Sequence, residues 1–389
     1  MTDLDDINFL ENLIQFLKEH EYLFKYPNKD IFITETFTTF VEKWSNLCKL
    51  TDEELLKLPY DKNLQETCDS KLSKFFEKIQ QFSILKPFPT VSMDMDIPKK
   101  LFIKMKMKKE YEIRKLLPIF LKECEKVGVK TVIDIGCGTV ANALILNEFV
   151  TTDSIQKIDE LIILHGPVAI ISLHGCGNLQ KVLLQIKASI NPSNIPLLFT
   201  LGCCYHKRTN ENSNEWAISE TIKTKLKNAS LFLPTSALRL GCDRGLLQWT
   251  QQTSEQFEAH KNAVFNRAII ETIFPESAAA ATTTSTTCHR NTNRNLTGNL
   301  ISTICDKHNV QPNERSIKEE ELKKSFEKYS NYKNFVQPFS MLQSAIQNPM
   351  ETLILLDSAY FLKENNQSAN FQALFDVLQS PRNMCLICS

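Results

Sequence analysis

The hydrophobic positions along the chain change from helical spacing to strand spacing and back again. Near the N-terminus the apolar side chains fall on one stripe of a helix, as in Phe9, Leu10, Leu13, Ile14, Phe16 and Leu17. This pattern predicts a helical N-terminal module over residues 1–98. Its end is marked by a cluster of prolines that interrupts helical periodicity, formed by Pro87, Pro89 and Pro98.

Three apolar runs, each followed by a glycine-bearing turn, predict buried strands over residues 130–135, 168–173 and 195–201. Helical spacing over residues 140–149 and 178–190 separates them. Alternation of strand and helix predicts an α/β fold with a mostly parallel, doubly wound sheet of the Rossmann-like type. Ligands of such sheets bind outside the carboxyl ends of the strands, so the site is expected there.

The α/β domain is predicted to span residues 99–274. A low-complexity linker follows over residues 275–315, because its Ala, Thr, Ser and Asn residues carry almost no apolar bulk. Residues 316–389 are predicted to add two helices, over 317–332 and 351–362, and a strand over 383–389 that closes the same sheet.

Composition narrows the class of protein. The 45 basic and 45 acidic residues give a net charge of zero, so neither a histone-like protein nor an acidic tail fits. With 42% hydrophobic and 23% charged residues, a globular fold is expected. Nine of the ten glycines lie between Gly128 and Gly245, which places the expected chemistry in that window.

The twelve cysteines show no disulfide framework, and the N-terminus is acidic rather than basic. They are interpreted as reduced thiols of a cytoplasmic or nuclear protein. The most apolar stretch, residues 161–173, is interrupted by Pro167 and is shorter than the ~20 residues of a membrane span, so no membrane segment is expected.

The segment from Lys99 to Lys115 is locally basic. It has eight Lys or Arg residues against Glu110 and Glu112. RNA contact through this segment is one interpretation. The favoured interpretation is a solvated helix face that leads into the first strand.

The turn after the first strand has the features of a nucleotide-type site. Asp134 closes the strand, and Gly136 and Gly138 let the backbone approach a ligand. The same pattern serves NAD enzymes and S-adenosylmethionine enzymes. An NAD enzyme is a less favoured interpretation than a methyltransferase. The acid that binds the NAD ribose is expected at the end of a full second strand, whereas the strand before Asp153 is very short.

The chain resembles the methyltransferase-like protein 25 family, a group of S-adenosylmethionine-dependent methyltransferase-like proteins that includes the ribosomal RNA adenine dimethylase domain-containing protein. The resemblance rests on Met105-x-x-Lys-Lys-x-x-Glu112, Val132-Ile-Asp-Ile-Gly-Cys-Gly138, Leu173-His-x-Cys-Gly-x-Leu179, Gly202-Cys-Cys-Tyr-His206, Glu351-Thr-Leu-Ile-Leu-Leu-Asp357 and Ser380-Pro-Arg-Asn383. It implies a Rossmann-like methyltransferase domain that binds S-adenosylmethionine through Asp134, Gly136, Cys137 and Gly138.

The chain departs from this family directly after Gly138. Residues 139–148 are too few for the helix, second strand and further helix that relatives carry, so the second strand is expected to be absent. Residues 149–153 resemble the third strand of the family. Asp153 is then expected to take over the ribose hydroxyls.

Three side chains beyond the strand ends are the candidates for catalysis. His174 follows the strand over 168–173, and Tyr205 and His206 follow the strand over 195–201. For His174, a base or substrate contact and a satisfied structural histidine are both open. The family's name suggests adenine methylation, but the Asn/Asp-Pro-Pro-Tyr signature of amino-group methyltransferases is absent.

The cysteines near these residues have a less specialised interpretation. Cys203 and Cys204 could serve as a nucleophile or with His206 as zinc ligands, but buried inert thiols are favoured. Cys385 and Cys388 point to opposite faces of a strand, so zinc is rejected there. Arg382 is expected to fix the last strand to a carbonyl rather than bind an anion. No metal site is predicted.

The function predicted from these features is methyl transfer from S-adenosylmethionine to an RNA or protein acceptor. The alternative is a catalytically inactive methyltransferase-fold protein that acts as a binding module, with the basic segment contacting RNA.

Overall fold

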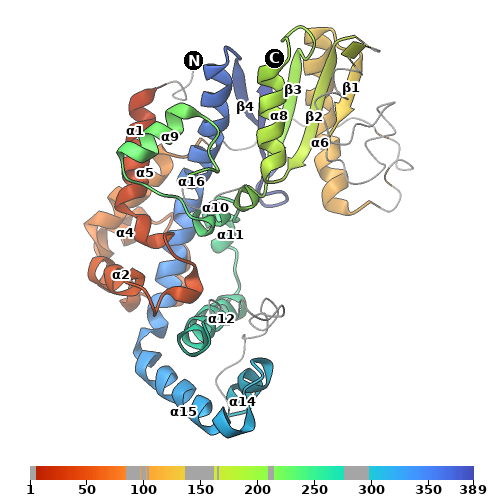
Figure 1. The fold of residues 1–389 in the computed structure, drawn as a ribbon. Coiled ribbons are helices and arrows are strands. Elements are labelled where there is room, and N and C mark those ends of the chain that lie inside the picture. Colours follow the sequence, from red (N-terminus) through yellow and green to blue (C-terminus); the bar gives the residue numbers. More distant parts are fainter. Residues whose placement is uncertain are drawn as a thin grey trace. The chain divides into compact units, whose positions relative to one another are not determined.

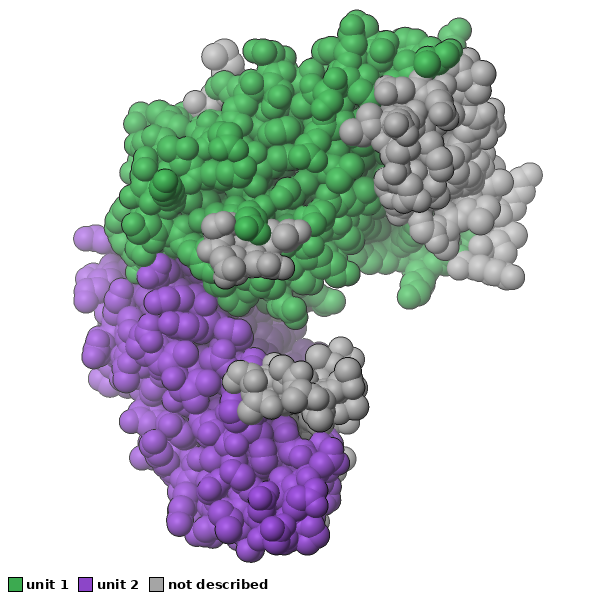
Figure 2. All heavy atoms as spheres, in the orientation of Figure 1, with its two compact units in different colours: residues 1–19, 81–244, 347–389 green, residues 20–80, 245–346 purple. Residues whose placement is uncertain are grey.

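The computed structural model describes residues 6–84, 97, 102, 105–135, 162–163, 166–208, 214–275 and 298–389. The chain divides into two compact units, which Figure 2 colours separately. Unit 1 comprises residues 1–19, 81–244 and 347–389, and unit 2 comprises residues 20–80 and 245–346. Each unit is therefore assembled from separate stretches of chain. The consecutive segments expected from the sequence stay a prediction.

Unit 1 contains a sheet whose five described strands have the order β1-β2-β3-β5-β4 (Figure 1). Strands β1, β2 and β3 are parallel, β5 is antiparallel to β3, and β4 is antiparallel to β5. Four of the strands consequently run in one direction, which confirms a mixed α/β fold with a mostly parallel sheet. Their bounds are Thr131–Asp134, Val168–Gly175, Leu197–Gly202, Ala369–Ala373 and Met384–Cys388.

Apolar side chains alternate between the two faces of this sheet, as the pleat of a strand requires. Helix α8 (Asn178–Ser189) packs on one face through Leu183, Leu184 and Ile186, and helix α6 (Met107–Val127) packs on the other. The two helices can be followed on the sheet in Figure 1. Cys385 belongs to the α6 face and Cys388 to the α8 face, which confirms that these two thiols diverge.

Helix α6 owes its position on the sheet to an apolar stripe and its end to a glycine. Its buried side chains include Leu116, Phe120 and Cys124, which recur every four residues and form the stripe that meets the sheet. The helix ends at Gly128, which adopts a left-handed conformation with φ +70° that glycine tolerates without a Cβ penalty. The chain then enters β1 directly.

The other described helices of unit 1 hold its remaining segments together. Lys18 of α1 donates to the carbonyl of Ser230, and Lys225 of α9 pairs with Glu11. The bounds of these elements are Ile7–Glu19 for α1, Tyr205–Lys207 for the short helix η6, Glu220–Asn228 for α9, Thr235–Leu240 for α10 and Val336–Glu364 for α16, of which residues 347–364 belong to unit 1.

The secondary-structure elements that the structure describes in unit 2 are all helices. One core lies among α12, α14 and α15 and includes Phe265, Ile269 and Leu322. Elsewhere in unit 2, the rings of Phe40 and Phe339 form an edge-to-face pair. The elements are η2 (Glu21–Leu23), η3 (Asn28–Asp30), α2 (Thr36–Trp44), η4 (Ser45–Lys49), α3 (Asp52–Lys57), α4 (Lys62–Cys68), α5 (Ser70–Gln81), α11 (Gly245–Trp249), α12 (Ser254–Ile273), α14 (Gly298–Lys307), α15 (Pro312–Tyr329) and η8 (Ser330–Phe335).

Several expectations lie outside the described residues. They are the helix over 140–149, the short strand over 149–153, the absence of a second strand and residues 276–297 of the linker expected over 275–315. The rest of that range is not a linker without structure, because Gly298–Lys307 forms helix α14 and Pro312 begins helix α15. Strand β4 was not expected from the sequence, and α16 begins at Val336 rather than at residue 351. Among the helices that the structure describes, none has the length and apolar character to cross a bilayer.

Candidate functional site

The carboxyl ends of β1, β2 and β3 lie at one edge of the sheet because these strands are parallel and adjacent. Asp134 ends β1, Gly175 ends β2 and Gly202 ends β3, and Gly175 is paired with Gly202 in the register. We call this region the carboxyl edge. Strand β5 is antiparallel to β3, so the residues that precede Met384 also approach it.

His174 has an unusual backbone at the carboxyl edge. Its φ is +65°, and the register between β2 and β3 shifts between Leu173 and Gly175. A left-handed conformation at a residue with a Cβ costs on the order of 1–3 kcal/mol and is retained where the surroundings over-determine it. The ladder is interrupted at this residue, and 28% of the side chain remains exposed.

The imidazole of His174 is held by Glu112 of helix α6. Both carboxylate oxygens lie 3.1 Å from His174 Nε2, and the Glu112 side chain is only 3% exposed. Ser380 donates its hydroxyl to Glu112 Oε1 at 2.7 Å, and Lys108 Nζ lies 3.5 Å from the same oxygen. Three segments that are distant in sequence thus meet at one carboxylate.

Glu112 is expected to be ionised near neutral pH. Burial alone would raise the pKa of its carboxyl, but the hydrogen bond and charge of His174, the Ser380 hydroxyl and Lys108 together lower it below its usual value. An ionised carboxylate only accepts hydrogen bonds, so Nε2 of His174 carries the proton. In the neutral form of the ring, Nδ1 is then the nitrogen that carries the lone pair.

The sequence itself carries a signal for Glu112. Glu112, Leu116 and Phe120 recur every four residues, so the acid lies on the apolar stripe of α6 rather than on its polar face. A carboxylate on a buried stripe needs a partner. That signal indicates a functional or structural acid, although it does not identify His174 as the partner.

Three cysteines gather beside His174. The Sγ atoms of Cys176 and Cys203 are 2.9 Å apart, and those of Cys203 and Cys204 are 3.5 Å apart. Burial raises the pKa of Cys176 and of Cys203, and the neighbouring thiols raise that of Cys203 further. A raised pKa disfavours an activated cysteine nucleophile at this place.

Tyr205 is buried under the carboxyl edge. Only 2% of Tyr205 is exposed, and its hydroxyl donates to Glu351 of α16 at 3.1 Å. Burial and the charge of Glu351 raise the pKa of Tyr205 well above its usual value. The phenol is therefore neutral and already has a hydrogen-bond partner.

Arg382 is part of the same buried network. Its guanidinium lies 2.5 Å from Glu351 and donates to the carbonyl of Gly241 at 2.6 Å. These contacts confirm the expectation that Arg382 fixes the segment before the last strand to a carbonyl. Because the Glu351 and Arg382 charges are almost fully buried, removal of one would leave the other without compensation.

His206 is half-buried at the start of the loop after β3. Its Nδ1 lies 3.6 Å from Cys242 Sγ, and the same sulfur receives the backbone N–H of Tyr205 at 3.0 Å. Burial and the positive charges of Arg239 and Lys207 lower the pKa of His206. The imidazole is thus neutral near pH 7.

A second buried ion pair stabilises the turns that present these residues. Arg208 lies 3.4 Å from Asp357 and donates to Gln180 at 2.7 Å. Gln180 in turn lies against Gly202, where a Cβ would approach its Oε1 to 2.3 Å. A side chain at residue 202 would therefore have to displace the Gln180 carboxamide to which Arg208 donates.

The residues expected to bind a cofactor are described only in part. Asp134 is 5% exposed at the end of β1. Gly136, Cys137, Gly138 and Asp153 lie outside the described residues. The structure therefore places Asp134, His174, Tyr205 and His206 around one sheet edge. Of these four, only His174 is both partly exposed and held by a carboxylate.

The basic segment is partly neutralised where it is described. Arg114 pairs with Glu110 at 2.8 Å and lies 4.4 Å from the centre of the Phe102 ring. Lys108 lies beside Glu112. RNA contact through this segment stays a prediction.

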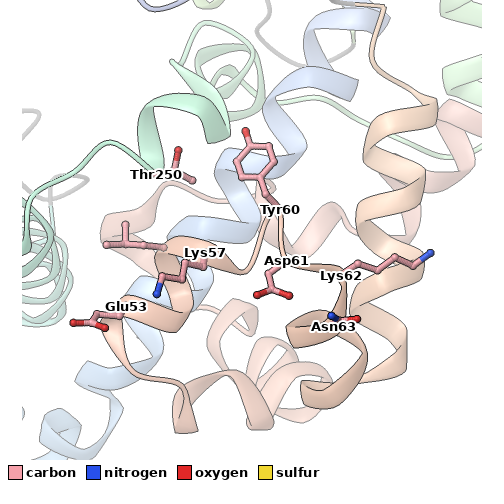
Figure 3. A pocket seen from close by; sticks show the side chains of 8 residues that line it. Glu53, Lys57, Tyr60, Asp61, Lys62, Asn63 and Thr250 are labelled. Atoms are coloured by element: carbon pink, nitrogen blue, oxygen red, sulfur yellow. The ribbon is translucent and has the colours of Figure 1, made fainter.

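A separate hollow of about 790 Å³ lies in unit 2, and Figure 3 shows the side chains that surround it. Its lining comes from α3, from the α3–α4 connection, from the start of α4 and from Thr250. Glu53, Lys57, Tyr60 and Asp61 are among these residues, and Tyr60 is 61% exposed. The hollow is open and contains no residue of the carboxyl edge.

Comparison with known proteins gives two similar sequences. The human protein named "Probable methyltransferase-like protein 25" is 25% identical over 263 residues, and the mouse protein of the same name is 24% identical over 262 residues. Each match covers 62% of this chain and 40% of the relative, so the chain spans well under half of their length. The similarity confirms the resemblance to this family that the motifs indicate. No protein-family profile matches the chain, and no solved structure matches it.

Proposed function

From its similarity to the methyltransferase-like protein 25 family, we propose that this protein is a methyltransferase that depends on S-adenosylmethionine. The proposed site is the carboxyl edge, and the acceptor is an RNA or a protein. The observation that carries the proposal is the partly exposed His174 imidazole, which Glu112 holds at the end of β2.

A Rossmann-like fold is part of this proposal. The parallel order β1-β2-β3 is what one half of a doubly wound sheet contains, and α6 and α8 cover its two faces. In such sheets the ligand lies beyond the carboxyl ends of the strands. Asp134 and His174 both occur there, which supports the placement of the site.

The chemistry of the described donors fits the cofactor. Asp134 offers a carboxylate at the end of a buried strand, and a carboxylate suits the amino group or hydroxyls of a nucleoside-linked amino acid. We propose that Asp134, Gly136, Cys137, Gly138 and Asp153 hold S-adenosylmethionine. When bound, S-adenosylmethionine supplies a methyl group on a positively charged sulfur.

His174 is proposed as the general base. Its Nδ1 takes the proton that the acceptor releases, because Nε2 is engaged with Glu112. The Glu112 carboxylate fixes the ring and stabilises the imidazolium that results. Glu112 is therefore a positioning residue, and Ser380 keeps its carboxylate oriented at 2.7 Å.

The other two candidate residues receive different roles. Tyr205 is proposed to position the loop after β3 through its hydrogen bond to Glu351. His206, which is half-buried and neutral, is proposed as the contact to the acceptor.

Calorimetry with S-adenosylmethionine tests the proposal. The full chain is expected to bind one equivalent, and Asp134→Asn is expected to weaken binding at least about 10-fold, because a charged hydrogen bond contributes about 1.5–3 kcal/mol. Asp243→Asn, at an exposed acid of unit 1, is the matched control and should bind as the wild type does. Absence of heat at high protein concentration would contradict the proposal.

Transfer from labelled S-adenosylmethionine to total RNA and total protein tests the base. His174→Gln is expected to lower incorporation by about 100-fold or more while it leaves cofactor binding intact. Cofactor binding without incorporation into either fraction would instead favour the non-catalytic binding module.

A further inference from the structure

Cys176, Cys203 and Cys204 form a cluster of thiols that has no role in the proposed function. We infer that these three cysteines form a binding site for a thiophilic metal ion, Zn²⁺. Their Sγ atoms all lie within 4.8 Å of one another. No other described group of three or more His, Cys, Asp or Glu side chains meets this condition.

The size of the sulfur triangle fits a metal centre. Zn–S bonds of about 2.3 Å in a tetrahedral site place sulfur atoms about 3.8 Å apart. The Cys203–Cys204 distance of 3.5 Å is close to this value, and the Cys176–Cys203 distance of 2.9 Å reaches it with a small opening of the two loops. Soft thiolate ligands select Zn²⁺ over the hard cations Mg²⁺ and Ca²⁺.

The local backbone explains how two consecutive cysteines can face one point. In a strand, neighbouring side chains alternate between faces, but β3 ends at Gly202. Cys204 has φ −103° and ψ 67° and directly precedes η6, so the chain is already turning at this place. Cys176 arrives from the corresponding turn after β2. Its neighbour Gly177 has φ +57° and lies against the backbone of Lys207.

The site offers three thiol ligands, so a tetrahedral ion bound there would keep one position for a non-thiol ligand. All three cysteines are half-buried, so an ion can enter from solvent. Among the described residues, no fourth His, Cys, Asp or Glu side chain joins the group. A metal with three protein ligands and an open position is typical of sites that bind water or an atom of a bound molecule.

A disulfide between Cys176 and Cys203 is the competing outcome. It would engage two of the three ligands and so exclude the ion. The metal site and the disulfide are therefore distinguished by the state of the thiols when Zn²⁺ is present.

Titration of the fully reduced, full-length protein with Co²⁺ tests the inference. The expected result is a thiolate-to-cobalt absorption band that saturates at one Co²⁺ per chain and disappears on addition of Zn²⁺. Cys203→Ser and Cys204→Ser should each weaken Co²⁺ binding by more than about 100-fold, because loss of an outer-shell partner alone costs about 10- to 100-fold. Cys68→Ser, at a half-buried cysteine of unit 2, is the matched control and should leave the band unchanged.

Three results would overturn the inference. They are the absence of the band in the reduced wild-type protein, an undiminished band in both cluster variants, and a Cys176–Cys203 disulfide that forms while Zn²⁺ is present. The wild-type titration needs no variant, so the inference can fail even if a substitution disturbs folding. Calorimetry with S-adenosylmethionine is a separate readout, so this inference and the proposed function can fail independently.

Discussion

At the scale of residues, the polar side chains of separate sequence motifs meet one another. Glu112 of one motif holds His174 of a second and accepts from Ser380 of a third. Glu351 and Arg382 pair in the same way. Both acids are almost fully buried, where an isolated charge would be costly. The residues of these motifs therefore form one hydrogen-bonded and charged network around the carboxyl edge.

The stability of the protein is expected to depend on Glu112 in a pH-dependent manner. Because the folded-state pKa of Glu112 is lowered, its contribution is fully present above its usual pKa of 4.5 and is lost as the pH falls through the folded-state value. Glu112→Gln should cost about 1–3 kcal/mol at pH 7 and less in acid. Urea unfolding at pH 7 and at pH 4 measures both differences.

Glu125→Gln is the control, since Glu125 is an exposed acid on the same helix and should change the free energy of unfolding by less than about 0.5 kcal/mol. An equal cost of Glu112→Gln at both pH values would show that the carboxylate is not stabilised by His174.

What the sequence reveals at this scale differs between residues. The position of His174 beyond a buried strand is predictable, because an apolar run and a glycine turn define the strand end. Its left-handed φ is not predictable, since the bulge depends on the register between β2 and β3. The Glu112 partner is missed for a similar reason, because it lies 62 residues away in the chain.

At the scale of elements, the strands that carry the site are the ones that the hydrophobic pattern predicts. The expected ranges 130–135, 168–173 and 195–201 correspond to β1, β2 and β3. Strand β4 escapes prediction because it is a short edge strand with only Ala373 buried, so it carries little apolar signal. Helix α16 begins at Val336, well before residue 351, although Pro349 lies inside it and an internal proline normally interrupts a helix.

The turn after β2 is expected to require glycine for two separate reasons. Gly177 has φ +57°, and a Cβ there would lie 2.7 Å from the carbonyl oxygen of Lys207. Gly177→Ala should therefore combine a backbone cost of about 1–2 kcal/mol with a packing cost of about 1–3 kcal/mol. The measurement is the free energy of unfolding from urea titration.

Gly128→Ala is the control that lacks the contact. Gly128 also has a positive φ of +70°, with ψ 22° where Gly177 has ψ −128°, but nothing lies within 4 Å of an added Cβ. It should show only the backbone cost. Equal losses for the two variants would mean that the contact between the turns after β2 and β3 is not tight.

At the scale of the whole molecule, the two units are built from non-consecutive stretches of chain. Local patterns predict helices and strands within a stretch, but they do not reveal which distant stretches pack together. Residues 347–389 join unit 1 through β4, β5 and the end of α16. Of this association, only the closing strand was anticipated from the sequence.

The basic segment leads to a prediction about RNA. If Lys106 and Lys108 contact phosphates, affinity for a single-stranded RNA oligonucleotide falls as salt rises, and the variant with both replaced by Gln loses about 0.7 from the slope of log K against log salt for each contact. Filter binding across a salt series measures this slope. Lys227→Gln, at an exposed lysine of α9, is the control. An affinity that does not change with salt would refute the contact.

Hydrogen exchange with and without S-adenosylmethionine shows whether the cofactor binds at the carboxyl edge of the sheet. Binding there is expected to slow exchange in residues 171–177 and 202–206 and to leave residues 53–63 around the hollow of unit 2 unchanged. Protection confined to residues 53–63, or exchange that the cofactor does not alter anywhere in the chain, would contradict it.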